Sequence, residues 1–69
     1  MIELTSSYKQ SIDGKFLLNP AHIIFVNRCE NFSHTQYENT NSFVEYLGAS
    51  ETQQVYVQET YEQIKELMK

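Results

Sequence analysis

The chain has 69 residues, a formal net charge of −4 at neutral pH and 41% hydrophobic residues. This length allows one small domain, and the hydrophobic content is sufficient for a core, which argues against a disordered chain. No apolar run approaches the roughly 20 residues that span a bilayer. The first residues lack the basic and apolar regions of a signal peptide, and the single cysteine cannot form an internal disulfide. Composition therefore excludes a membrane protein, a disulfide scaffold and a basic nucleic-acid binder. It predicts one cytoplasmic domain over residues 1–69, of bacterial or phage origin.

The first part of the chain predicts two strands joined by a turn. Ile2 and Leu4 alternate with polar residues, which is typical of a strand with one buried face. The pair Asp13-Gly14 supplies the positive φ angles that a type I′ hairpin turn needs. Residues 15–18 then form the returning strand, which ends at Asn19-Pro20 because proline cannot donate to a strand ladder.

Three further strands are predicted in the middle of the chain. Ile23–Val26 is apolar at four consecutive positions, so a strand over residues 22–28 is expected to be covered on both faces. The polar residues 29–41 predict a long connection with a short strand around residues 34–38. Residues 42–47 and 52–58 alternate as two strands joined by a turn, with Phe43, Glu45 and Leu47 facing away from Val44 and Tyr46.

The last segment predicts a helix. Thr60 and Gln63 fit a capping box, in which the threonine hydroxyl and the glutamine side chain each bond the other residue's backbone. Apolar residues then recur at helical spacing and are expected to pack against the sheet: Tyr61, Ile64, Leu67 and Met68. The predicted fold class is α+β, with a small antiparallel β-sheet of four to five strands and one C-terminal α-helix.

This fold is expected to be homo-oligomeric. One short helix cannot cover both faces of such a sheet, and a core of this size is marginal on its own. A second copy is the simplest cover, and the predicted dimer interface draws on Phe25, Phe43 and Tyr46. Pairing between edge strands is a further expected contribution.

Three segments resemble the small FlbD/SwrD-like flagellar family: Met1–Thr5, Gly14–Pro20 and Val55–Thr60, the last running into the terminal helix. The resemblance implies a small, cytoplasmic, non-enzymatic accessory protein with no catalytic residues to transfer. The chain departs from the family pattern in a longer loop at residues 6–12 and an insertion at residues 29–41. It also has Gln58 where the family has a lysine. Residues 25–34 are similar to part of LytTR-type DNA-binding domains, but the chain is shorter than those domains and lacks their basic residues.

Candidate chemistry is sparse. The residue types that bind metals or act as nucleophiles are separated along the chain: His22, Cys29, Glu30 and His34. Zinc sites use paired short spacings that are missing here. A catalytic cysteine needs a histidine, an orienting acid and an oxyanion loop, and no such motif is recognisable. The sequence therefore predicts no enzyme, no metal and no cofactor.

Charge is distributed unevenly. Residues 29–64 carry six carboxylates and no lysine or arginine. Solubility alone is one interpretation. The sharper one is an acidic surface with aromatic residues that binds a basic partner, with these predicted binding residues: Glu38, Glu45, Glu51, Tyr37 and Tyr46.

The function hypothesis is a homodimeric, non-enzymatic protein that binds, and inhibits, a basic partner such as a nucleic-acid-binding protein. It would act as a phage DNA mimic does, without contacting nucleic acid or membrane itself. Two alternatives stay open: an FlbD-like flagellar accessory protein, and a phage-type protein that sequesters a small signalling ligand between subunits.

Overall fold

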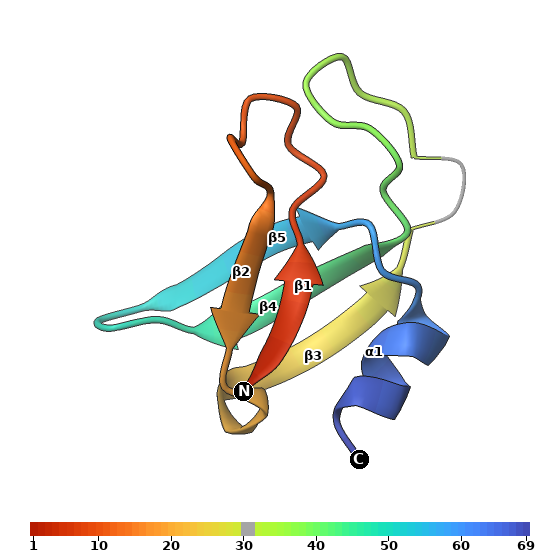
Figure 1. The fold of residues 1–69 in the computed structure, drawn as a ribbon. Coiled ribbons are helices and arrows are strands. Elements are labelled where there is room, and N and C mark those ends of the chain that lie inside the picture. The colour runs from red at the N-terminus through yellow and green to blue at the C-terminus, as the bar shows by residue number, and fades with distance from the viewer. Residues whose placement is uncertain (30–31) are drawn as a thin grey trace.

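A computed structural model describes residues 1–29 and 32–69 of the chain. Within them lie five strands, a single-turn 3₁₀-helix and one C-terminal helix (Figure 1). The elements are β1 (Ile2–Thr5), β2 (Lys15–Leu18), η1 (Pro20–His22), β3 (Ile23–Arg28), β4 (Ser42–Leu47), β5 (Thr52–Val57) and α1 (Tyr61–Leu67). All strand pairings are antiparallel, so the predicted α+β class is confirmed.

The prediction of a single sheet is wrong, because the strands form two. β1 pairs with β2, and β3, β4 and β5 form a second sheet in that order. The chain beyond β1 leaves its hairpin partner and reaches the end of β5, where Ser6 bridges Val57. There the Ser7 N–H donates to the Tyr56 carbonyl at 2.9 Å, and the Gln58 N–H donates to the Thr5 carbonyl at 2.8 Å. These bonds hold the two sheets around a common core.

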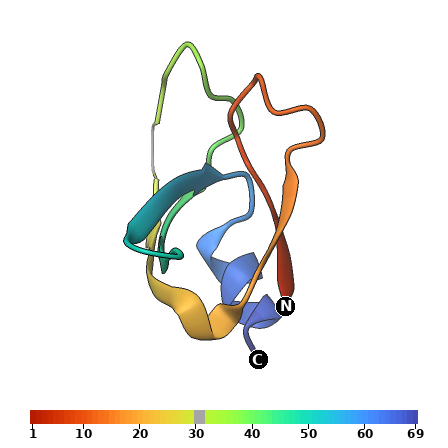
Figure 2. The ribbon, with the colours of Figure 1, turned by 90° about the vertical axis from the view of Figure 1, so that its left-hand side faces the viewer.

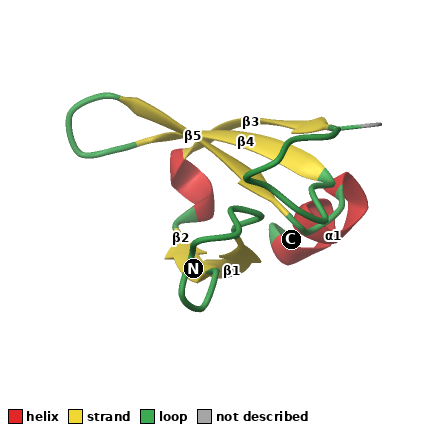
Figure 3. Ribbon diagram, turned by 90° about the horizontal axis from the view of Figure 1, so that it is seen from above, coloured by secondary structure: helices red, strands yellow, loops and turns green. Residues whose placement is uncertain are grey.

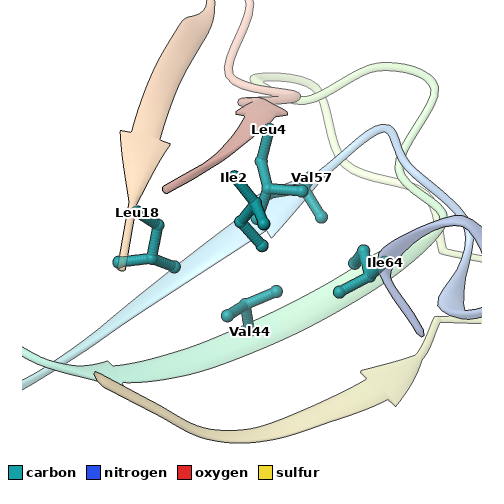
Figure 4. Close-up of a cluster of buried hydrophobic side chains, with 6 residues drawn as sticks. All are labelled: Ile2, Leu4, Leu18, Val44, Val57 and Ile64. Atoms are coloured by element: carbon teal, nitrogen blue, oxygen red, sulfur yellow. The ribbon is translucent and has the colours of Figure 1, made fainter. Parts of the chain in front are cut away.

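The hairpin β1–β2 and the helix α1 lie on the same face of the three-stranded sheet (Figures 2 and 3). The buried apolar side chains fill the space between these layers (Figure 4): Ile2, Leu4, Leu18, Val44, Val57 and Ile64. Tyr46, Val26 and Ile23 are half-buried at the border of this core. We call this side the inner face of the sheet, and the opposite side the outer face.

The predicted type I′ turn at Asp13-Gly14 is wrong. A type I′ turn needs positive φ at both central residues, and of this pair only Gly14 has it, at +80°. Residues 6–14 form a longer loop that the Ser6 N–H closes on the Gly14 carbonyl. The reason is tertiary, because the hairpin ladder ends at the Ser6–Gly14 bond and the next residue, Ser7, bonds to Tyr56 of β5 instead.

The capping box at the start of α1 is confirmed, whereas the apolar stripe of the helix packs only in part. The Gln63 N–H donates to Thr60 Oγ1 at 3.1 Å, and the Thr60 N–H donates to Gln63 Oε1 at 2.8 Å. Ile64 is 1% exposed, but Leu67 and Met68 remain 45% and 42% exposed. The helix has seven residues and docks through one turn, so the prediction that Leu67 and Met68 pack against the sheet is wrong for the single chain.

One other strand prediction needs correction, because the short strand expected around residues 34–38 is reduced to isolated bridges, His34 with Tyr37 and Tyr8 with Tyr37. β3 is an edge strand, and its Ile24 and Phe25 are 50% and 38% exposed in the single chain. The cover of both faces of β3, expected from a second copy, stays a prediction. In the described part of the chain, no helix has the length and apolarity that crossing a membrane requires.

Candidate functional site

The outer face of the three-stranded sheet follows directly from strand alternation. Val44 and Val57 point into the core, so their neighbours along β4 and β5 point the other way. The register then places Phe43 between Asn27 and Tyr56, and Glu45 between Phe25 and Gln54. The outer-face positions are Phe25, Asn27, Phe43, Glu45, Leu47, Thr52, Gln54 and Tyr56.

Aromatic rings form a continuous row across this face. Ring centroids are 6.0 Å apart for Phe25 and Phe43, and 5.1 Å apart for Phe43 and Tyr56. The row continues from Tyr56 to Phe32 at 4.6 Å and to Tyr37 at 5.1 Å. It ends on Tyr8, 5.5 Å from Tyr37. These separations lie in the range of favourable aromatic pairs. We call these six residues the aromatic row: Phe25, Phe43, Tyr56, Phe32, Tyr37 and Tyr8.

Backbone hydrogen bonds hold the loop that carries Tyr37 against the loop that carries Tyr8. The Lys9 N–H donates to the Gln36 carbonyl, and the Glu38 N–H donates to the Ser7 carbonyl, both at 2.9 Å. The Thr40 hydroxyl adds a bond of 2.7 Å to Ser7 Oγ. The loop end of the row is therefore positioned before any partner arrives.

The rings are packed against one another yet remain accessible. Phe25 is 38% exposed, and the other members of the row are half-buried. Side chains in this state present ring faces and edges to solvent while losing little further rotamer freedom when they bind. Aromatic residues of this kind are enriched at interface hot spots.

The charge on the outer face has one sign. Its strand positions carry one carboxylate, Glu45, and no lysine or arginine. Glu45 Oε1 accepts a hydrogen bond of 3.0 Å from the Gln54 amide, a neutral group that orients the carboxylate without neutralising it. Glu38 is exposed next to Tyr37 in the sequence. The aromatic row thus lies beside two carboxylates, and one lysine, Lys9, follows Tyr8 at its loop end.

The structure brings together some of the predicted binding residues and separates others. Tyr37, Glu38 and Glu45 lie on or beside the aromatic row. Glu51 lies in the exposed turn between β4 and β5, at the far end of the sheet. Tyr46 points to the inner face and packs against the core. Of the predicted interface residues, Phe25 and Phe43 are adjacent on the outer face, and Tyr46 is on the other side.

The acidic block of residues 29–64 is also less uniform than the sequence indicated. Glu59 accepts hydrogen bonds from the Thr5 N–H at 2.7 Å and the Thr5 hydroxyl at 2.8 Å, which gives it a structural role. Glu62 pairs with Arg28, and the hydrogen bond from that guanidinium lowers the pKa of the Glu62 carboxyl. Glu30 lies outside the described residues. Three carboxylates of this block have no cationic partner among the described residues: Glu38 and Glu51, which are exposed, and Glu45, which is half-buried.

Sequence reasoning missed Tyr56, Phe32 and Tyr8 as members of the site. The alternation of residues 52–58 already separated Tyr56 from Val55 and Val57, so its outward direction was readable. Its position opposite Phe43 depends on the strand register, which the sequence does not give. Phe32 and Tyr8 lie on loops, where no periodic pattern indicates which side chains meet.

Of the residues considered for catalysis or metal binding, the structure describes His22, Cys29 and His34. Within residues 1–29 and 32–69, no three His, Cys, Asp or Glu side chains converge on a point that could hold a metal ion. Cys29 is half-buried, and this burial raises the pKa of its thiol, which disfavours the reactive thiolate. Arg28 lies over the Tyr61 ring at 4.2 Å and is engaged with the helix.

Comparison of the chain with protein-family models, curated proteins and solved structures finds no match. The resemblance to the FlbD/SwrD-like family therefore stays a prediction from the residues quoted above.

Proposed function

We propose that this chain is a non-enzymatic binding protein whose outer face binds a basic segment of a partner protein. The observation that carries the proposal is the aromatic row, with Glu45 beside it and no lysine or arginine at the outer-face strand positions. We propose a nucleic-acid-binding protein as this basic partner. The outer face would occupy the surface with which that protein binds nucleic acid and would thereby inhibit its binding of nucleic acid.

Ring faces and carboxylates recognise the same cations in complementary ways. A lysine or arginine within about 6 Å of a tyrosine or phenylalanine ring is attracted by the ring quadrupole. A carboxylate adds charge-assisted hydrogen bonds, which are bidentate with arginine. Tyr56 and Phe43 supply rings next to the Glu45 carboxylate, so one guanidinium could contact both kinds of group.

The same geometry disfavours nucleic acid as the direct ligand. Sheets that bind single strands also present aromatic rings, but they place them in a positively charged groove that follows the phosphates. Here Glu45 occupies the middle of the face and repels phosphate. A basic protein segment is the ligand that matches both the rings and the charge.

Fluorescence anisotropy with three labelled probes tests the proposal: an Arg/Lys-rich peptide, a Glu-rich peptide of the same length and oligo-dT. We expect the basic peptide to bind best and its affinity to fall with salt, because exposed charges are screened over about 8 Å at physiological ionic strength. Tighter binding of oligo-dT than of the basic peptide would overturn the choice of a protein partner.

Matched variants separate a specific site from bulk acidity. The double variant Glu38→Gln/Glu45→Gln is expected to weaken binding about tenfold and to flatten the salt dependence, because both charges border the row. Glu51→Gln removes an exposed carboxylate far from the row and is expected to change binding less than twofold, a rough bound for a rim charge. Equal losses per charge at all three positions would mean that binding follows the overall charge of the chain, and would overturn a site beside the aromatic row.

Aromatic variants test the second half of the recognition. Phe43→Ala and Tyr56→Ala remove rings from the middle of the row and are expected to weaken binding with an unchanged salt slope, since rings act largely through burial. Tyr46→Ala, on the inner face, is expected to lower stability rather than peptide affinity. If Phe43→Ala and Tyr56→Ala bind the basic peptide as the parent does, the aromatic row is not the site.

A further inference from the structure

A groove of about 300 Å³ runs between the edge strand β3 and the helix α1. Four consecutive β3 residues form one wall, Ile23–Val26, and the helix residues of the other wall are Tyr61, Ile64, Lys65 and Met68. Phe25 and Val26 are consecutive in the regular part of β3 and point to opposite faces of the sheet, so a groove lined by both runs along the edge of β3. This groove is separate from the outer face, although Phe25 belongs to both.

The backbone of β3 is open at this edge. β3 pairs with β4, and no second strand of the described residues pairs with its other side. The Cys29 N–H donates to the Asn41 carbonyl at 3.1 Å, which sets the phase of the antiparallel ladder. Bonded and non-bonded pairs alternate along such a ladder, so the N–H and C=O of Val26 and Arg28 point away from β4. They are free to receive another strand.

The devices that normally protect an edge strand are weak along this segment. Charged side chains and bulges discourage edge pairing. The bulge in β3 falls between Ile23 and Phe25, so the register from Phe25 to Arg28 is regular. The one charge of β3, Arg28, is held against α1 by the Glu62 carboxylate and the Tyr61 ring. Ile24 and Phe25 are left exposed instead.

We infer that the edge of β3 pairs with β3 of a second copy of this chain. The two copies then form one six-stranded sheet, in which both aromatic rows lie on the same face. When two copies pair antiparallel through the same edge strand, the outer faces of their sheets lie on the same side of the combined sheet. Phe25 of each copy lies next to the line where the two β3 strands meet, so the aromatic row of one copy continues into that of the other.

Charge and apolar exposure favour a second copy as the occupant. The chain carries a net charge of −4, which opposes self-association over most of its surface. β3 and residues 61–69 are the exception, with three cations, Arg28, Lys65 and Lys69, against two carboxylates, Glu62 and Glu66. Three of the exposed large apolar side chains, Ile24, Phe25 and Met68, line the groove, and pairing would bury them in both copies.

Light scattering coupled to size exclusion, at micromolar concentration, measures the assembly directly. We expect a mass near twice the 8.1 kDa of one chain. Ile24→Lys places a charge at the edge and is expected to give a monomer. Leu47→Lys is the matched control, because Leu47 is 52% exposed on the outer face away from the groove, and it is expected to remain a dimer. A monomeric parent protein, or a dimeric Ile24→Lys variant, overturns the inference.

Amide hydrogen exchange gives a readout that needs no variant. The Val26 N–H points away from β4 at the open edge of the sheet. It is expected to exchange slowly in a concentrated sample and at least tenfold faster after dilution to monomer, a rough bound for loss of a strand hydrogen bond. A concentration-dependent dimer whose Val26 amide exchanges rapidly throughout would place the contact elsewhere. Neither measurement involves the basic peptide, so this inference and the proposed function fail independently.

Discussion

Truncation of Ile64 tests how the helix α1 is held to the rest of the domain. Ile64 is 1% exposed and is the buried residue that α1 contributes to the core. Removing most of a buried isoleucine side chain costs about 2–5 kcal/mol, part of it for the cavity that remains. The site borders the groove beside β3, where neighbouring side chains can relax, so we expect Ile64→Ala to cost about 3 kcal/mol.

Leu67 provides the matched control one turn further along the same helix. It is 45% exposed, so it has about half of the 1.5–3 kcal/mol that full burial of a leucine supplies. Leu67→Ala is therefore expected to cost about 1 kcal/mol. Isoleucine has a lower helix propensity than leucine, so Ile64→Ala gains slightly more propensity than Leu67→Ala, and a larger loss of stability at position 64 therefore reports its burial.

Urea unfolding followed by circular dichroism measures the loss of unfolding free energy for both variants. All samples are kept at one protein concentration, because self-association would make stability depend on concentration. A domain of this size has about 3–5 kcal/mol in total, so Ile64→Ala approaches complete unfolding. Ile64→Val, with an expected cost of about 0.5–1.5 kcal/mol, keeps the comparison measurable. Equal destabilisation by Ile64→Ala and Leu67→Ala would refute the docking of α1 through Ile64.

Two further predictions concern the start of α1, where Thr60 caps the helix and Glu62 pairs with Arg28. Thr60→Ala removes the hydroxyl that accepts the Gln63 N–H and is expected to lower the free energy of unfolding by about 1 kcal/mol, whereas Thr60→Ser keeps the cap; a thermal melt that leaves Thr60→Ala unchanged would contradict the capping box. The hydrogen bond from Arg28 lowers the pKa of the Glu62 carboxyl. The stability that this ion pair contributes to the fold is therefore fully present above the ordinary carboxyl pKa, and it is lost as the pH falls through the lowered pKa. Arg28→Gln is expected to raise the Glu62 pKa toward its ordinary range in an NMR titration, and an unchanged pKa would show that the pair does not form in solution.

Local chemistry in the sequence was enough to place most elements. Alternating apolar residues located the strands, because an alternation of period two indicates a strand with one buried face whichever strand it pairs with. Thr60 and Gln63 located the start of α1, because a capping box closes between residues three apart. The same alternation places Phe43 and Glu45 on one face of their strand and Tyr46 on the other.

The grouping of Tyr46 with Tyr37 and Glu45 as one surface conflicted with this alternation, because Glu45 and Tyr46 are neighbours on one strand and lie on opposite faces. Which of the two faces meets the core is decided when the layers pack. Packing of the hairpin and α1 on the Val44 side turned Tyr46 inward and left Phe43 outward. The aromatic row then formed from rings on three strands and two loops that share no sequence period.

The division into two sheets was also decided by contacts distant in sequence. Glu59 accepts hydrogen bonds from Thr5 across 54 positions, and Ser7 bonds to Tyr56, so the chain after β1 is drawn to the end of β5. At the opposite edge of the same sheet, β3 pairs with β4 alone. The sequence by itself determined what each segment becomes, since propensity, alternation and capping act over a few residues. Which segments meet was decided by the tertiary structure, because register and layer packing depend on the whole chain at once.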